Sequence, residues 1–371
     1  MNQYKNQKAF LALVRAGLWE QDVRLLPHQD IEFQEVYRLA TEQSVLGLVL
    51  AGLEHVDVKP PKELLLQWIG EVQQIEQRNK TMNGFVANLI EKLRSEDVYA
   101  ILVKGQGIAQ CYERPLWRSS GDVDLFLNDS NFERAKNFLR PLSSYASQEL
   151  KGEKHIEFYI DNWPVELHGN LPSRLFMRID KVLDDVQKAI FYGGNVRSWM
   201  NNDTQVFLPS VDCDVVFVFT HFLKHFYRGG IGIRQICDWS RFLWCFRHSL
   251  NMSLLEKRIK KMGLMSEWKA FAYFSVHHLG TPANVMPFYT PSNKWRRKSD
   301  KICSYILEVG NFGHNRDHSY YNKYPYVIWK FISFWKHTKD SLRFFVIFPV
   351  DSMKVWRMMT LEGFSELLSR R

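Results

Sequence analysis

Three acidic residues in two short β-prone segments have the types and spacing of a metal site. Asp122 and Asp124 stand two residues apart, and Glu166 stands in Pro164-Val-Glu-Leu-His168. Because side chains alternate faces along a strand, Asp122 and Asp124 point to one side and the apolar residues beside them face a core. Neighbouring carboxylates repel unless a cation lies between them, and hard oxygen ligands suit Mg²⁺, with Mn²⁺ as the alternative. The pattern predicts a metal site completed by Glu166 from a neighbouring strand.

A site of this kind suits the transfer of a phosphate-containing group. Two metal ions held by three carboxylates polarise a phosphate, lower the pKa of an attacking hydroxyl and neutralise departing pyrophosphate. Lys104-Gly105-Gln106-Gly107 fits the phosphate end, because glycines let the backbone approach and N–H groups at a helix N-terminus attract anions. Lys104 or Arg118 adds a positive charge. We therefore expect a nucleoside triphosphate as a ligand.

The elements that position these residues are short strands alternating with helices. An apolar, β-prone segment at 98–103 predicts a buried strand, followed at Lys104 by a turn and a helix. A capping box formed by Ser130 and Glu133 predicts a helix start. The remaining predicted strands are 122–127, 155–160 and 164–168, the last two joined by the turn Asp161-Asn162-Trp163.

Helical periodicity flanks this mixed segment on both sides, so an α+β fold is expected. Pro60 and Pro61 predict the start of a long helix through Ile75. The predicted division is a helical N-terminal module at 1–97, a catalytic core at 98–210 and a helical C-terminal module at 211–371. Predicted C-terminal helices include 211–226, 233–246, 254–262 and 266–279.

Three runs of residues carry a family resemblance. They are Leu102-Val103-Lys104-Gly105, Tyr112-Glu113-Arg114-Pro115 and Arg118-Ser119-Ser120-Gly121-Asp122-Val123-Asp124-Leu125, and Glu166-Leu167-His168 follows as an acidic-x-His strand. With them the chain is similar to an uncharacterised nucleotidyltransferase family of the DNA-polymerase-β-like superfamily.

The resemblance implies a polymerase-β-like core that transfers a nucleoside monophosphate from a triphosphate to an acceptor hydroxyl that the sequence does not identify. It implies that Asp122, Asp124 and Glu166 are catalytic metal ligands. The implied nucleotide-binding residues are Lys104, Gly105, Gln106, Arg118, Ser119, Ser120, His168, Arg234 and Asp238. Members are often associated with bacterial surface-polysaccharide loci.

Two positions depart from the pattern of the superfamily. Gly105 is followed by Gln106 where Ser or Gly is usual, and Ser119 or Ser120 is the candidate replacement for the hydroxyl. Glu166 stands where Asp is more usual, and its longer side chain still ligates metal. These departures concern the phosphate contacts more than the metal ligands.

Several polar residues allow two interpretations. His168 contacts substrate or fixes a carboxylate. Arg234 and Asp238 form an intrahelical ion pair or face the nucleotide. His221 and His225 are four apart, but without the glutamate of His-Glu-x-x-His and without a third ligand they predict a structural role rather than zinc binding.

Composition bounds the partners and the compartment. The chain has 371 residues, 46% of them hydrophobic, a net charge of +9 and five widely spaced cysteines, which are expected to be buried thiols. The N-terminus lacks an apolar signal-peptide region, and no apolar run reaches about 18 residues, so a cytoplasmic protein is expected. The positive charge suits a polyanion or an anionic membrane surface. No clear nucleic-acid-binding motif is present.

Two other functional classes stay open. One is a catalytically weak or inactive protein that keeps the fold and binds a nucleotide or a partner. The other is an RNA-binding accessory factor, which only the net charge favours. The segment that begins at Tyr326 is basic and aromatic, and it predicts either a core-facing helix with a basic outer face or a helix lying on an anionic membrane.

Overall fold

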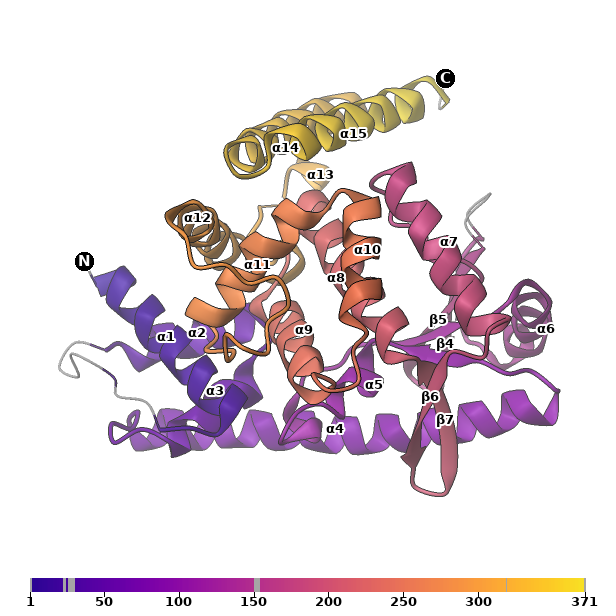
Figure 1. Ribbon diagram of the computed structural model, residues 1–371, viewed down its shortest axis with the longest axis horizontal. Helices are drawn as coiled ribbons and strands as arrows, with labels where there is room; N and C mark the ends of the chain where they lie inside the picture. Colours follow the sequence, from indigo (N-terminus) through magenta and orange to yellow (C-terminus); the bar gives the residue numbers. More distant parts are fainter. Residues whose placement is uncertain (1, 23–24, 26–30, 150–153, 318, 370–371) are drawn as a thin grey trace.

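A single mixed sheet lies between a long helix on one face and a layer of C-terminal helices on the other (Figure 1). The computed structural model describes residues 2–22, 25, 31–149, 154–317 and 319–369. The first and last positions of the predicted terminal modules, 1 and 371, lie outside the described residues. The α+β class is confirmed.

The elements follow the order that the sequence predicts, with helices before, within and after the sheet. The N-terminal helices are α1 (Asn2–Trp19), α2 (Phe33–Glu42), α3 (Leu46–Glu54) and α4 (Lys62–Ser95). The strands are β1 (Ile101–Val103), β2 (Val123–Phe126), β3 (Tyr145–Ala146), β4 (His155–Ile160), β5 (Trp163–His168), β6 (Val196–Asn201) and β7 (Thr204–Pro209). Between the strands lie α5 (Gly105–Ala109), α6 (Asp129–Leu139) and α7 (Met177–Phe191).

The C-terminal part is helical throughout its described residues. Its helices are α8 (Val211–Arg228), α9 (Ile233–Cys245), α10 (Met252–Met262), α11 (Met265–His277), α12 (Asn293–Val309), α13 (Tyr320–Lys323), α14 (Tyr326–Ile347) and α15 (Pro349–Ser369). The four C-terminal helices predicted from periodicity are therefore confirmed within a few residues at each end.

The strand order is β3-β4-β5-β2-β1-β7-β6. The central strand β2 pairs antiparallel with β1 and parallel with β5, and in this register Asp124 stands directly opposite both Val103 and Glu166. The strands β4 and β5 form an antiparallel hairpin in which His155 is opposite His168. The sheet thus brings together residues that are more than 60 positions apart in the chain.

Each face of the sheet has its own apolar core. Val123 and Leu125 are buried against α4 and α6, together with residues of β4 and β5. Phe126 points to the other face and belongs to a larger core that runs from α1 to α15. Because this larger core includes parts of all three predicted modules, their division remains a prediction.

The turn after β1 has an unusual backbone. Lys104 has φ 58° and Gly105 has φ 39°, two consecutive residues in a region that favours glycine. A Cβ atom at Gly107 would lie 2.7 Å from Leu208 Cδ2, so α5 packs closely on β7. Glycines at this turn therefore allow a sharp change of direction beside Asp122 and close helix packing.

Three local predictions were wrong in detail. Residues 98–100 are not part of β1, because the N–H of Val98 bonds to Leu93 O at the end of α4. The cap of α6 is Asn128 rather than Ser130, since Asn128 Oδ1 accepts from the Asn131 N–H at 2.8 Å. The β4–β5 turn contains Asp161 and Asn162 alone, and β5 begins at Trp163.

The last two helices form an antiparallel hairpin at the edge of the molecule opposite α4 (Figure 1). Trp356 of α15 donates to Thr338 of α14 at 3.0 Å, and Phe344 and Ile347 are buried. None of the helices in the described residues has the length and apolar character needed to cross a bilayer. Cys245 is exposed, which corrects the expectation for that thiol, whereas the other four cysteines are buried.

Candidate functional site

The three predicted carboxylates converge on one face of the sheet. One oxygen from each of Asp122, Asp124 and Glu166 lies within 4.8 Å of the others. The parallel pairing of β2 with β5 explains this, because it places Asp124 and Glu166 side by side on the same face. Asp124 is 2% exposed, so the cluster is sunk into the protein.

Repulsion inside the cluster is visible at Asp122. The neighbouring Asp124 and then burial raise the pKa of Asp122 above its ordinary value. Burial also raises the pKa of Asp124, but Lys104 and His168 outweigh it, so the pKa is lowered. The ionised form of Asp124 is therefore stabilised by its cationic neighbours, whereas the ionised form of Asp122 is destabilised by Asp124.

Lys104 is the nearest cation to this cluster. Its Nζ lies 2.6 Å from Asp124 Oδ1. Burial lowers the pKa of Lys104, but Asp124 and Asp122 raise it by more, so the ammonium stays charged. The strained turn at Lys104 and Gly105 places the Lys104 side chain beside the carboxylates. Backbone strain of this kind often occurs at functional sites.

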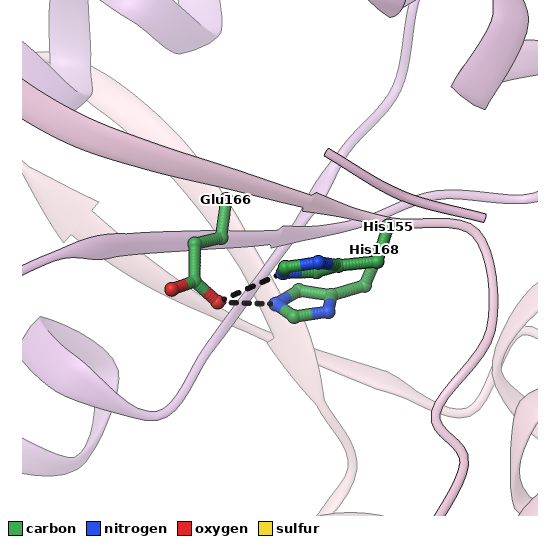
Figure 2. Close-up of side chains that lie close together, drawn as sticks. All are labelled: His155, Glu166 and His168. Atoms are coloured by element: carbon green, nitrogen blue, oxygen red, sulfur yellow. Dashed lines mark hydrogen bonds and ion pairs between the residues drawn. The ribbon is translucent and has the colours of Figure 1, made fainter. Parts of the chain in front are cut away.

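Two histidines flank Glu166, as Figure 2 shows. Nε2 of His155 lies 3.2 Å and Nε2 of His168 lies 3.4 Å from the same atom, Glu166 Oε2. His168 Nε2 also lies 2.9 Å from Asp124 Oδ1. Hydrogen bonds from His155 and His168 lower the pKa of Glu166 well below its usual range. In this structure His168 holds two carboxylates.

Arg118 and Asp238 form a buried bidentate pair. Arg118 Nε and Nη2 donate to the two Asp238 oxygens at 2.9 and 2.7 Å, and both side chains are 6% exposed. The Tyr112 hydroxyl donates to Asp238 at 2.7 Å. Asp238 thus forms its direct ion pair with Arg118 from the loop before β2, and Arg234 acts on Asp238 through its charge without a direct ion pair between them among the described contacts.

A polar network joins Gln106 of α5 to the loop before β2. Gln106 is 3% exposed; it donates to Asn79 at 3.2 Å and accepts from the Ser120 hydroxyl at 3.3 Å. Ser120 in turn accepts from Arg118 at 2.8 Å, and the Ser119 carbonyl accepts from Arg234. Gln106 and Ser120 thus support the loop before Asp122.

A cleft extends from the carboxylates in two directions. One branch is lined by Lys104, Gly105, Arg118, Asp122, Asp124, Arg234, Asp238 and apolar residues of α8. The other branch, with a volume of about 420 Å³, is lined by His155, Glu166, His168, Arg174, His221, Lys224 and His225 among others. Lys104, Asp122, His221 and Phe312 line both branches, so the two branches adjoin at these residues. Its size falls in the range of small-molecule sites.

One face of helix α8 lines the second branch. Phe217, His221, Lys224 and His225 recur at helical spacing and line it together. His225 Nε2 lies 3.1 Å from His221 Nε2, a contact that requires at least one neutral imidazole. Burial, then Lys224, lowers the pKa of His225 to about 3, so the neutral form prevails. No third ligand accompanies this pair among the described residues that could form a metal cluster.

The cleft has an excess of fixed positive charge. Its described lining contains the cations Lys104, Arg118, Arg174, Lys224 and Arg234 against the carboxylates Asp122, Asp124, Glu166 and Asp238. Burial, followed by Arg174 and Lys104, lowers the pKa of Lys224 to about 8. Arg234 Nε has no hydrogen-bond partner within the described part of the chain. An anionic ligand would relieve both conditions.

Sequence reasoning missed three residues of this cleft. His155 was assigned only to a strand, although a two-residue hairpin turn would have placed it opposite His168. Lys224 interrupts the apolar run of α8, and that interruption was the available signal. Arg174 follows no motif, and only the folded chain brings it to the cavity.

The geometry defines a class: an α+β protein whose sheet presents three carboxylates to a cationic cleft. The chain belongs to a family described as uncharacterised nucleotidyltransferase, whose sequence pattern matches residues 29–280, more than half of its length. The resemblance stated from the motifs is confirmed. No curated protein and no solved structure matches the chain significantly.

Proposed function

We propose that this protein is a metal-dependent nucleotidyltransferase with a polymerase-β-like core, which moves a nucleoside monophosphate from a triphosphate to an acceptor hydroxyl. The observation that carries the proposal is the convergence of Asp122, Asp124 and Glu166 within 4.8 Å at the floor of a cleft rich in lysine and arginine. Carboxylates beside fixed cations suit a metal–triphosphate complex, because the metal neutralises the acids and the cations neutralise the phosphates.

The residues fit Mg²⁺ or Mn²⁺ by their donor chemistry. Asp124 of β2 and Glu166 of β5 offer carboxylate oxygens from adjacent strands, and Asp122 offers its own from the residue before β2. The raised pKa of Asp122 reflects repulsion by Asp124 that a divalent cation would relieve. When bound there, such an ion would polarise the α-phosphate and lower the pKa of the acceptor hydroxyl.

The cations of the cleft receive the phosphates in this proposal. Lys104 reaches the carboxylate cluster, and Arg234 faces the same branch with an unpartnered Nε atom. Arg118 is occupied by Asp238, so its role is to fix the loop before Asp122 rather than to bind phosphate. Ser119, through its carbonyl, and Gln106 support the same loop.

The proposed reaction is a substitution at the α-phosphorus. The acceptor oxygen forms a bond to phosphorus, the bond to the bridging oxygen of the β-phosphate breaks, and pyrophosphate leaves, while the hydroxyl proton passes to water. Glu166, a member of the carboxylate cluster, and His168 beside it line the second branch, where they are placed to orient the acceptor. The second branch, with Arg174 and Lys224, is the proposed acceptor space.

One observation favours the second candidate function, a nucleotide- or partner-binding protein without transferase activity. The Lys104 ammonium lies 2.6 Å from Asp124 and neutralises the most buried carboxylate. A lysine in that position competes with a metal ion for the same oxygen. The two functions differ in whether Mg²⁺ strengthens nucleotide binding.

Calorimetric titration with ATP, GTP, CTP and UTP, with and without Mg²⁺, tests the proposal. We expect one nucleotide to bind only with Mg²⁺, and we expect Asp122→Ala with Asp124→Ala to abolish that binding. Asp129→Ala, an exposed acid outside the cleft, is the matched control. Metal-independent binding by the native chain would favour the second candidate in its nucleotide-binding form. The absence of binding to all four nucleotides would overturn the transferase proposal and favour a partner-binding role.

A further inference from the structure

The two histidines beside Glu166 form a ligand set with a donor chemistry different from that of the three carboxylates. His155, Glu166 and His168 each offer one ligand atom, and these atoms lie within 4.8 Å of one another. Figure 2 shows both imidazoles aimed at the same carboxylate oxygen. We propose that these residues bind a transition-metal ion of the zinc type, at a position separate from the ion held by Asp122 and Asp124.

The distances match a coordination polyhedron. Zinc bonds to histidine nitrogen and carboxylate oxygen are about 2.0–2.2 Å long, so two ligands at angles of about 90–110° are about 2.9–3.5 Å apart. Nε2 of His155 and Nε2 of His168 lie 3.2 and 3.4 Å from Glu166 Oε2. Both separations fall inside this interval, so binding needs only small shifts of the side chains.

The backbone already fixes the three ligands. His155 and His168 are directly opposite each other in the β4–β5 hairpin, and Glu166 is two residues from His168 on the same face. The ring centroids of His155 and His168 lie 4.9 Å apart with an interplanar angle of 36°. Because the hairpin sets all three positions, little ordering is left for the moment of binding.

The donor set determines which ions bind. Two imidazoles and one carboxylate suit Zn²⁺, Co²⁺ or Mn²⁺, whereas Mg²⁺ prefers oxygen ligands alone. Three protein ligands also leave a coordination position open, as in catalytic rather than structural zinc sites. All three ligand residues line the cavity branch that also contains Arg174 and Lys224, where an anionic group can approach.

Titration of the metal-free full-length chain with Co²⁺ tests this site, because visible absorption reports cobalt bound to nitrogen ligands. We expect one Co²⁺ per chain, at least about tenfold weaker binding for His155→Gln, and less than about threefold change for Asp122→Asn. His225→Gln is the matched control, since that histidine lines the same cavity outside the cluster. Nucleotide is absent, so the outcome does not depend on the proposed transferase activity.

A measurement on the native chain removes the dependence on variants that fail to fold. Bound Zn²⁺ should protect His155 and His168, but not His314, from carbethoxylation read by peptide mass spectrometry. Equal cobalt affinity of the native chain and His155→Gln would overturn the proposal. So would the absence of histidine protection, or a loss of cobalt binding in His225→Gln.

An independent observation concerns the hairpin of α14 and α15, whose outer face is apolar. On α14, Val327, Phe331, Trp335, Leu342 and Val346 are 58–67% exposed. With Ile328 and Phe345 they fall within an arc of about 100° of the helix, so they form one stripe. Exposed apolar surface of this extent marks an interaction site.

The second helix extends the same surface. Val350, Met353, Leu361 and Phe364 of α15 are 52–65% exposed and lie within an arc of about 80°. A groove of about 250 Å³ between the helices is lined by Leu342, Phe345, Met353 and Trp356 with small polar residues. The groove joins the two stripes into one surface, which we call the apolar hairpin face.

The charges around this face are positive. The four carboxylates of the described hairpin are paired: Asp340 with Arg316, Asp351 with Arg178, Glu362 with Arg228 and Glu366 with Lys330. Lys339, Lys354 and Arg357 are exposed and have no carboxylate partner among the described residues. We propose that the apolar hairpin face rests on an anionic lipid surface, with aromatic residues among the acyl chains and these cations at the headgroups. A second copy fits less well, since it would bring like charges together.

Sedimentation with lipid vesicles tests this surface. The full chain should bind vesicles of phosphatidylcholine with phosphatidylserine at least about tenfold more tightly than phosphatidylcholine alone. Phe331→Ser with Trp335→Ser, and separately Lys339→Glu with Lys354→Glu, should each reduce binding at least about tenfold. Leu66→Ser, exposed on α4, is the control. Unchanged binding in both variants, or a dimer in light scattering that the Phe331→Ser and Trp335→Ser changes dissociate, would overturn the proposal.

Discussion

The cleft and the apolar hairpin face both depart from the usual distribution of residues, because the cleft buries charged side chains and the hairpin exposes apolar ones. In the cleft, charged side chains are buried and paired, Arg118 with Asp238 and Asp124 with Lys104. On the hairpin, large apolar side chains such as Phe331 and Trp335 are exposed. A buried charge is costly without a partner, and an exposed apolar patch is costly in a monomer.

The two regions therefore contribute differently to the stability of the fold. The charges of the cleft are tied to the sheet and to α9, so changing them affects both stability and chemistry. The exposed residues of the hairpin contact few neighbours, so changing them should affect binding alone.

The largest effect is expected at the centre of the carboxylate cluster. Asp124→Asn removes a ligand charge and should lower the rate of nucleotidyl transfer by about 10³-fold or more, equivalent to about 4 kcal/mol. Pyrophosphate release measures this rate, and thermal unfolding checks the fold. Asp129→Asn, which removes an exposed charge, should retain the native rate. Native activity in Asp124→Asn would exclude the residue from the metal site.

The buried ion pair of Arg118 with Asp238 is expected to contribute mainly to the stability of the protein. Arg118→Met leaves Asp238 charged, buried and without its bidentate partner, so the free energy of unfolding should fall by about 3–5 kcal/mol. Urea denaturation measures the loss. Arg118→Met with Asp238→Leu should recover most of it, because neither charge is then buried. If the single and double variants are equally unstable, the pair is not the cause.

Lys224 should show a trade-off between stability and ligand binding. Its pKa is lowered to about 8, below the ordinary value of 10.5, so the unfolded chain binds the proton more tightly. The destabilisation is complete below pH 8 and disappears as the pH rises through 10.5. Lys224→Met should therefore stabilise the ligand-free protein by about 1–3 kcal/mol at pH 7 and weaken binding of anionic ligands.

Urea denaturation at pH 7 and pH 10.5 tests this sign, with the exposed Lys260→Met as control. The difference between Lys224→Met and the native chain should shrink at the higher pH. A difference that stays constant over this range would mean that packing, and not the charge of Lys224, sets the stability.

The smallest effect is expected on the hairpin. Trp335→Ser should change the free energy of unfolding by no more than about 0.5 kcal/mol, because the side chain is 58% exposed. Phe344→Ala, on the buried side of the same helix, should cost about 3–5 kcal/mol. Thermal unfolding of the two variants compares the two faces directly. A large loss in Trp335→Ser would show that the face is part of the core.

The centre of the site could be predicted because its signal is local. The alternation in Asp122-Val-Asp-Leu and in Val-Glu-Leu-His168 fixes which side chains share a face, whatever the strands pair with. The pattern does not give the neighbour of the Glu166 strand, which we expected beside the Asp124 strand; the register of β2 with β5 places Glu166 directly opposite Asp124. The turn at Lys104 could likewise be predicted from the sequence, because Gly105 and Gly107 follow it.

The rest depends on distant packing that no local pattern encodes. The pairing of Asp238 with Arg118 joins residues 120 positions apart and replaced the helical pair suggested by the spacing of Arg234 and Asp238. The hairpin shows the same limit, because the periodicity of α14 reveals an amphipathic helix but not which face the core covers. In the structure the core takes Phe344 and leaves Phe331 exposed.

The two-residue turn of the β4–β5 hairpin offers a place for a label away from the cleft. Asp161 and Asn162, with φ of 48° and 68°, form the turn at one end, whereas His155 and His168 stand at the other. Five residues of antiparallel strand separate the ends by about 17 Å. A fluorophore or affinity tag at Asp161 would therefore report on the strand pair that carries Glu166, while leaving the cleft clear for ligands.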